Sequence, residues 1–105
     1  GAAYKESADY IVSVIETNDL KELKVYACDN QFALVYYSKF KFSLLSNSRY
    51  SDIILCDTYK EQLQKYTGDF KYDTTHTLVK SVQREGVSLN KIWASEPLVK
   101  YFNHE

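Results

Sequence analysis

The stretch Ser51–Asp57 places four apolar residues in a row between two aspartates, and this feature limits the folds that the chain can adopt. The run, Ile53–Cys56, shows no alternation of polar and apolar positions. A short unbroken apolar run with β-branched residues is typical of a strand that is covered on both faces. Layers above and below such a strand predict an α/β sandwich rather than a one-sided sheet.

The composition predicts one globular domain without a strong charge field. Of 105 residues, 45% are hydrophobic and 26% are charged, and the formal net charge is −1. This length is enough to bury a core, and the net charge excludes a global basic surface for nucleic acid or acidic membranes. No apolar run approaches the length of a membrane span. We expect residues 1–3 to be a cloning scar and residues 4–105 to be a single α/β domain excised from a longer protein.

Cys28 and Cys56 are the two cysteines, and both lie in apolar, strand-like runs. We expect buried free thiols that behave as small hydrophobic side chains, with a disulfide as the alternative. The chain shows no Cys or His spacing typical of a metal site. The sequence therefore predicts neither a metal nor a cofactor.

The first half of the chain contains several β-branched and aromatic runs. Ala8–Glu16 is nearly continuous in apolar residues and predicts a second buried strand. Asp19–Leu23 fits a short helix, whereas Leu23–Cys28 fits a strand, and the pattern does not decide between them. Phe32–Tyr37 predicts a further strand, which continues through Ser38–Leu45 with period-two alternation.

The second half carries signals of helix starts and stops. Thr58 and Glu61 have the spacing of a capping box, and Tyr59, Leu63 and Tyr66 recur with helical period. A helix is therefore expected over 58–67, ended by Gly68.

Three more elements are expected after this helix. Thr74–Gly86 predicts another helix with Leu78, Val79 and Val82 on one face, and Val87–Leu89 predicts a short strand. Ser95 before Glu96-Pro97 predicts the start of a final helix.

This order of elements resembles a BRCT domain. The resemblance rests on the following segments: Ile11–Ile15, Asp19–Leu23, Phe32–Tyr37, Ser51–Cys56, Thr75–Gly86, Gly86–Leu89 and Trp93. It departs from that family where Asp29-Asn30-Gln31 replaces the usual Gly-Gly pair and where the helix at 58–67 is inserted. The resemblance implies service in nuclear or chromatin assemblies. In members that bind phosphopeptides, it also implies a Ser or Thr after the first strand and a Lys on the second major helix, where Thr17 and Lys80 stand nearest.

Lys39 and Lys41 are the candidates for contact with nucleic acid. Alternation along a strand would place both lysines and Tyr37 on one exposed face, with Phe40 and Phe42 on the other. Proteins that bind single strands stack bases on aromatic side chains beside the cations. The competing interpretation is an edge strand whose charges block pairing with another chain.

The remaining polar residues are expected to be structural. We expect His76 and His104 to be solvated, Asp57 to cap a helix and Trp93 to lie in the core. No catalytic arrangement of residues is recognisable, so the chain is not predicted to be an enzyme.

The sequence thus predicts a BRCT-like α/β domain with a central, mostly parallel sheet of about four strands flanked by helices. Its expected function is that of a non-catalytic protein–protein interaction module in a larger intracellular scaffold, nuclear if the resemblance holds. The expected partner is a protein or peptide, phosphorylated or not, and the candidate binding residues are Thr17, Lys80, Tyr37, Lys39 and Lys41. The alternative is a small nucleic-acid-binding domain, such as a viral one, that uses the Lys39/Lys41 strand.

Overall fold

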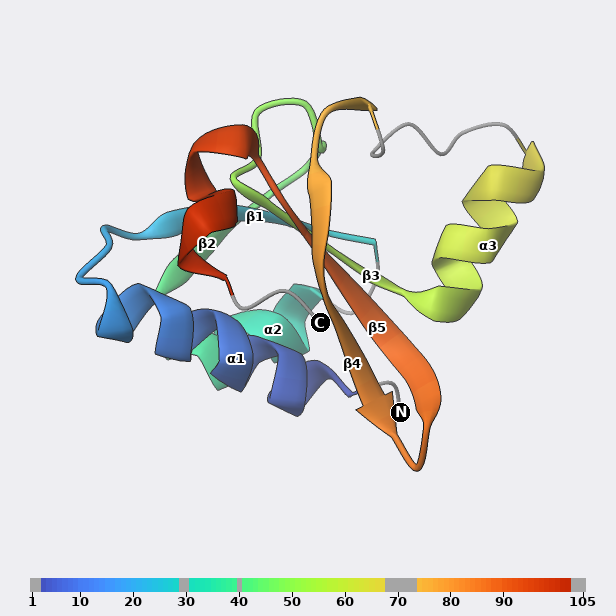
Figure 1. Cartoon of the computed structure of the whole chain (residues 1–105), viewed down its shortest axis with the longest axis horizontal. Helices are drawn as coiled ribbons and strands as arrows, with labels where there is room; N and C mark the ends of the chain where they lie inside the picture. Colours follow the sequence, from blue (N-terminus) through green and yellow to red (C-terminus); the bar gives the residue numbers. More distant parts are fainter. Residues whose placement is uncertain (1–2, 29–30, 40, 68–73, 103–105) are drawn as a thin grey trace.

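The structure is a computed structural model that describes residues 3–28, 31–39, 41–67 and 74–102. A five-stranded sheet with the order β2-β1-β3-β5-β4 forms its centre (Figure 1). The elements in chain order are α1 (Tyr4–Thr17), β1 (Leu23–Ala27), α2 (Gln31–Ser38), β2 (Phe42–Leu45), β3 (Ile53–Asp57), α3 (Thr58–Thr67), β4 (Thr77–Arg84), β5 (Val87–Ala94) and the 3₁₀ helix η2 (Glu96–Tyr101). The predicted α/β class is confirmed.

Strand β3 lies in the middle of the sheet, as the sequence predicts. Its residues Ile53–Cys56 are all 0% exposed. β3 pairs in parallel with β1, where Ile53 lies opposite Val25, and antiparallel with β5, where Ile54 lies opposite Trp93. The prediction of a mostly parallel sheet is wrong, because two of the four strand pairings, β2–β1 and β1–β3, are parallel, whereas β3–β5 and β5–β4 are antiparallel.

The segment expected as an N-terminal strand is helix α1, so that prediction is wrong. Its buried residues recur every three or four positions: Tyr4, Ser7, Ala8, Ile11, Val14 and Ile15. This spacing places them on one face of a helix, which packs against the sheet. The β-branched residues in the run suggested a strand, but the three- and four-residue spacing of the buried positions decides the structure.

Helix α2 replaces the strand predicted at Phe32–Tyr37. It connects β1 to β2, and these neighbours run parallel. A parallel pair needs a crossover connection, so the topology selects helix in a segment whose composition favours strand. Only Phe42–Leu45 of the predicted extension is a strand, and Phe40 lies outside the described residues. At 23–28, where the sequence left two readings open, β1 is a strand.

The helix expected over 74–86 is the first strand of a hairpin instead. β4 and β5 join through Glu85 and Gly86, whose φ angles are 53° and 80°. Two adjacent residues with positive φ make the tight turn that matches the twist of paired strands, and glycine adopts this φ without strain. The sequence predicts Gly86 as the end of a helix, but Gly86 forms part of the hairpin turn. The expected final helix is present as the 3₁₀ helix η2.

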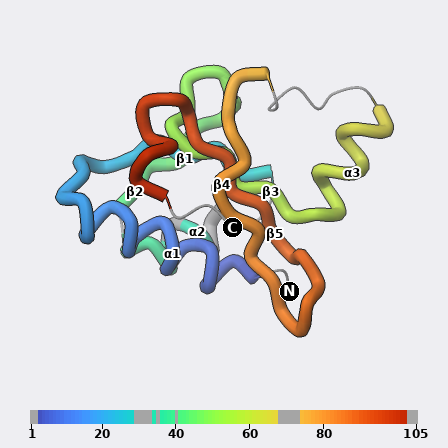
Figure 2. Tube along the Cα trace, in the orientation of Figure 1, coloured from blue at the N-terminus to red at the C-terminus, as the bar shows by residue number. Residues whose placement is uncertain are grey.

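The two faces of the sheet bury clusters of different size. The larger cluster includes Ile11, Leu34, Ile53 and Ile92 and lies on the side of α1 and α2, which run side by side beneath the sheet (Figure 1 and Figure 2). The smaller cluster on the other face consists of Ile54, Cys56 and Trp93, with Tyr26 and Cys28 packed against it. Trp93 is 7% exposed, which confirms its expected place in the core.

Cys28 and Cys56 form a disulfide, so the expectation of free thiols is wrong. Cys56 directly follows Leu55, which lies opposite Ala27 in the pairing of β1 with β3. The cysteines therefore meet across adjacent strands, with their Cα atoms 4.8 Å apart. The sequence pattern predicted β3 but left the segment before Cys28 undecided between helix and strand. It did not show that the two segments are neighbours, and this adjacency is what brings the thiols together.

Helix α3 has the predicted bounds and the expected cap at Asp57, but its inward face differs from expectation. Asp57 is the capping residue, because its Oδ1 accepts a hydrogen bond of 2.7 Å from the backbone N–H of Lys60. Glu61 is only 1% exposed, and its Oε1 accepts from Lys91 at 2.9 Å and from Lys65 at 3.0 Å. A buried ion pair to β5 thus joins α3 to the sheet. The expected helix stop at Gly68 lies outside the described residues.

We expect the disulfide to be a major source of stability. It closes a loop with a sequence separation of 28 residues. Loss of this cross-link should lower the free energy of unfolding by about 3 kcal/mol, because the unfolded chain regains the entropy of the open loop. Urea unfolding of the wild-type protein with and without reductant measures this difference. The double variant Cys28→Ser/Cys56→Ser should match the reduced protein, and two titratable thiols in the unfolded, non-reduced protein would contradict the pairing.

We expect Glu61→Gln to destabilise the protein by about 1–2 kcal/mol, because it leaves two lysines without their carboxylate. The side chains of Lys91 and Lys65 are 23% and 50% exposed, so water compensates part of the loss. Chemical denaturation measures the change. The matched control is Glu22→Gln at an exposed position, which should stay within about 0.5 kcal/mol of wild type. Equal effects of the two substitutions would refute the anchoring role of Glu61.

Candidate functional site

One face of α1 lines an open groove of about 460 Å³. The lining residues of α1 are Asp9, Val12, Ser13, Glu16 and Thr17, which lie three or four positions apart. This spacing places them on a common helix face, beside the face that packs on the sheet. All five side chains are at least partly exposed, so the groove opens to solvent along the helix.

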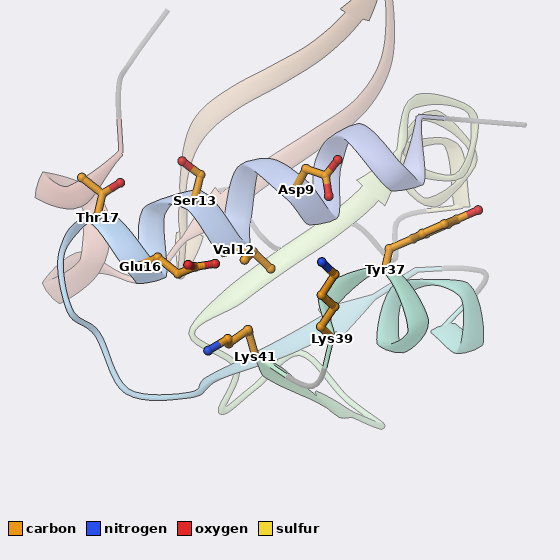
Figure 3. Close-up of a pocket in the computed structure, with 8 residues that line it drawn as sticks. All are labelled: Asp9, Val12, Ser13, Glu16, Thr17, Tyr37, Lys39 and Lys41. Atoms are coloured by element: carbon orange, nitrogen blue, oxygen red, sulfur yellow. The ribbon is translucent and has the colours of Figure 1, made fainter.

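The opposite wall comes from the end of α2 and the turn into β2. Tyr37, Lys39 and Lys41 line this wall, and in Figure 3 the side chain of Lys39 extends toward α1. Lys39 has a φ of 52°, and its backbone N–H donates to the carbonyl of Tyr36 at 3.3 Å. This left-handed residue ends α2 and turns the chain, which places the lysines on the same side as α1. Glu16 and Lys41 lie at one end of the groove, and Asp9 and Tyr37 lie at the other (Figure 3).

The groove contains charges that the domain itself does not pair. Asp9 accepts from Lys5 at 2.8 Å. Within the described part of the chain, Glu16, Lys39 and Lys41 make no ion pair. These three exposed groups are therefore available to charged side chains of another molecule.

A second pocket adjoins the groove at the end of α1. It is lined by Ile15, Glu16, Asp19, Leu20, Glu22 and Lys41, so Glu16 and Lys41 belong to both pockets. Together the two pockets present four carboxylates and two ammonium groups. This surface is mixed in charge and acidic at the end of α1.

Four of the five predicted site residues lie in the groove. Thr17, Tyr37, Lys39 and Lys41 line it together, although no strand carries the lysines as the alternation suggested. Lys80 lines a different pocket, where its ammonium lies 5.3 Å from the ring centre of Tyr10. The pair expected to hold a phosphopeptide, Thr17 and Lys80, is thus divided between two pockets. Thr17 ends a helix rather than a strand, and Lys80 lies on strand β4.

The α1 wall of the groove is not among the site residues predicted from the sequence. Asp9, Ser13 and Glu16 are polar residues three or four positions apart, and this helical period was visible in the sequence. The interpretation of Ala8–Glu16 as a buried strand hid it. Val12 lies among these polar residues and is half-buried at the groove floor.

His76 is buried at 8% exposure, so the expectation of a solvated side chain is wrong. Its Nε2 lies 2.9 Å from the carbonyl oxygen of Ser51, which can only accept, so Nε2 carries the proton and donates it there. Its Nδ1 then accepts from the hydroxyl of Thr75 at 2.8 Å. Because Nε2 is already protonated, it cannot take a proton from the Ser51 hydroxyl 3.4 Å away, and this pair is not an activated nucleophile. His104 lies outside the described residues.

The structure gives the remaining acids local roles and reveals no metal cluster in the described ranges. Asp57 caps α3 as expected, and Asp52 Oδ2 accepts from the backbone N–H of Lys24 at 2.8 Å. Nowhere in residues 3–28, 31–39, 41–67 and 74–102 do three His, Cys, Asp or Glu side chains gather as metal ligands. Across these same residues, no helix combines the length and apolar character needed to cross a bilayer.

Near the pocket around Lys80, a surface ion pair between Glu6 and Arg84 lowers the pKa of Glu6. The pKa of Glu6 is lower than that of an ordinary glutamate, first because its own backbone N–H donates to the carboxylate and then because Arg84 lies 2.7 Å away. A lowered folded-state pKa means that the pair contributes stability above the unfolded pKa and loses it as the pH falls through the folded pKa.

We expect Arg84→Gln to raise the pKa of Glu6 while leaving it below the ordinary value, because the backbone hydrogen bond remains. A titration followed by the carboxyl carbon shift of Glu6 measures this change. Arg49→Gln, at an exposed residue elsewhere, is the matched control and should leave the titration unchanged. An unaltered pKa of Glu6 in the Arg84 variant would show that the ion pair does not form in solution.

Comparison with protein-family models, with curated proteins and with solved structures gives no match for this chain. The resemblance to a BRCT domain therefore stays a prediction. Four of the segments that carried it have another secondary structure. Ile11–Ile15 and Phe32–Tyr37 are helical, and most of Thr75–Gly86 is a strand. Asp19–Leu23, expected as the first helix, is a turn that leads into β1.

Proposed function

We propose that this domain is a non-catalytic protein–protein interaction module that binds an extended segment of a partner protein in the groove between α1 and the α2–β2 turn. The observation that carries the proposal is the exposed face of α1 opposite Lys39 and Lys41, with charges that the domain leaves unpaired (Figure 3). Exposed charges along a concave surface fix the orientation and register of a bound segment more than they raise its affinity.

The charge distribution favours a polypeptide that carries both signs of charge. An acidic side chain fits beside Lys39, and a basic one fits the end of α1, where Glu16, Asp19 and Glu22 lie. The same carboxylates oppose a nucleic acid, whose phosphates would lie within one Debye length of them. They oppose a phosphorylated side chain for the same reason, so we favour an unphosphorylated segment.

The size of the groove sets the expected strength of binding. A volume of about 460 Å³ accommodates a few side chains rather than a whole folded surface. Interfaces of this extent belong to the weak, transient class, for which dissociation constants of roughly 1–100 μM are ordinary. We therefore expect rapid exchange of the partner rather than a permanent complex.

The disulfide supports a place of action outside the cytosol and nucleus. Disulfides persist in oxidising environments and are rare where thiols are kept reduced. The Cys28–Cys56 pair therefore supports an extracytosolic setting over the intracellular, chromatin-associated one that the BRCT resemblance implies.

Peptide selection followed by a map of the binding site tests the proposal. Peptides selected from a displayed random 12-residue library on the disulfide-intact protein should shift amide signals of Asp9–Thr17 and Tyr37–Lys41 in NMR spectra. We expect Lys39→Glu/Lys41→Glu to weaken binding of these peptides at least about tenfold, because it makes the groove uniformly acidic.

Lys21→Glu is the control, since this lysine is exposed and does not line the groove. Single-stranded DNA and RNA are tested in parallel at low salt. Binding of either at the same residues, with affinity that falls steeply as salt rises, would replace the proposal with the nucleic-acid alternative. Selected peptides that bind without shifts in the groove would refute it.

A further inference from the structure

Helix α3 turns its apolar side chains toward solvent. Tyr59, Leu63 and Tyr66 are 72%, 43% and 90% exposed. Their spacing of four and three residues aligns them along one face of the ten-residue helix, and we call these three residues the α3 stripe. Such spacing normally marks the face that a helix buries, so the stripe is an apolar surface that the fold leaves uncovered.

The opposite face of α3 explains why the stripe is not needed for folding. Glu61 is the buried residue of this helix, and it accepts from Lys91 of β5. Gln64 lies near the disulfide, with its amide nitrogen 4.0 Å from Cys28 Sγ. Polar contacts therefore hold α3 to the sheet, whereas Tyr59 and Tyr66 keep most of their surface exposed to solvent.

The charges beside the stripe are basic. Lys60 makes no ion pair among the residues that the structure describes, and Lys65 shares the single carboxylate of Glu61 with Lys91. Apart from the buried Glu61, the charged residues of α3 are Lys60 and Lys65. A partner surface with apolar side chains at its centre and carboxylates at its margins complements both features.

We infer that the α3 stripe is a docking surface for an amphipathic helix of another protein, with an apolar face flanked by acidic residues. This surface is separate from the groove, because α3 lies at the end of β3 and away from α1 and α2 (Figure 1 and Figure 2). The inference therefore goes beyond the proposed function, and a domain with both surfaces would connect two partners.

A second copy of this chain fits the stripe less well. In a two-fold antiparallel pairing centred on Leu63, Lys60 of one copy would meet Tyr66 of the other, so its ammonium group would gain no opposite charge. The area is also too small for a stable dimer. With about 200 Å² for a fully exposed tyrosine, Tyr59 and Tyr66 offer roughly 300 Å² at their exposures of 72% and 90%. Stable interfaces bury about 800 Å² on each partner.

Two synthetic helical peptides test the inference on the full, disulfide-intact chain. Both carry the same leucine stripe and have equal helicity, and one has glutamates and the other lysines at the flanking positions. We expect the acidic-flanked peptide to bind with a dissociation constant of roughly 10–200 μM and the basic-flanked peptide at least about tenfold more weakly. Tyr59→Ser/Tyr66→Ser should weaken the acidic-flanked peptide at least about tenfold.

Tyr50→Ser is the matched control, because Tyr50 is 70% exposed and lies in a loop outside α3. It should leave binding unchanged, and equal melting temperatures of all variants would show that folding is intact. Equal binding of the two peptides, or unchanged binding by the Tyr59/Tyr66 variant, would overturn the inference. Sedimentation that shows a dimer abolished by the same double substitution would also overturn it, in favour of a second copy. Lys39→Glu/Lys41→Glu should not affect the acidic-flanked peptide, which separates this test from that of the groove.

Discussion

The pairing of β3 with a parallel strand on one side and an antiparallel strand on the other is the constraint on which this structure depends. Because Ile53–Cys56 are fully buried, both faces of the sheet must be covered. The parallel neighbour β1 leads into the crossover helix α2, whereas the antiparallel neighbour β5 needs only a hairpin to reach β4. The groove forms on the half of the sheet that has the crossover.

Different interactions attach α1 and α3 to the two faces of the sheet. On the side of α1, large aliphatic side chains remove apolar area from water, which is the dominant favourable term in folding. On the other side, α3 contacts the sheet through the buried carboxylate of Glu61, which pairs with Lys91 of β5 and with Lys65 of α3. The cost of removing this carboxylate from water offsets much of its attraction to the two lysines. The apolar packing under α1 mainly supplies stability. The ion pairs of Glu61 orient α3 and leave Tyr59 and Tyr66 exposed.

The sequence predicts those elements whose local pattern agrees with their place in the fold. The Ile53–Cys56 run and the helix at 58–67 have this agreement, and both were found. Phe32–Tyr37 lacks it, because its composition favours strand while its position between parallel strands requires helix. The lysines of the groove were identified on the wrong argument, since a turn and not an alternating strand brings them together. Neither the disulfide nor the exposure of Tyr59 and Tyr66 follows from local pattern, because both depend on which strands become neighbours.

The disulfide also closes a covalent ring that contains one wall of the groove. The segment between Cys28 and Cys56 contains α2 and β2, and therefore Tyr37, Lys39 and Lys41, while α1 lies outside this ring. A protease that cuts once within the ring, for example at the exposed Arg49, opens the backbone without releasing a fragment. Both walls of the groove lie before Arg49, and after such a cut the disulfide keeps them attached to the part of the domain that follows it. Only when a nick and reduction occur together does the domain separate into two pieces.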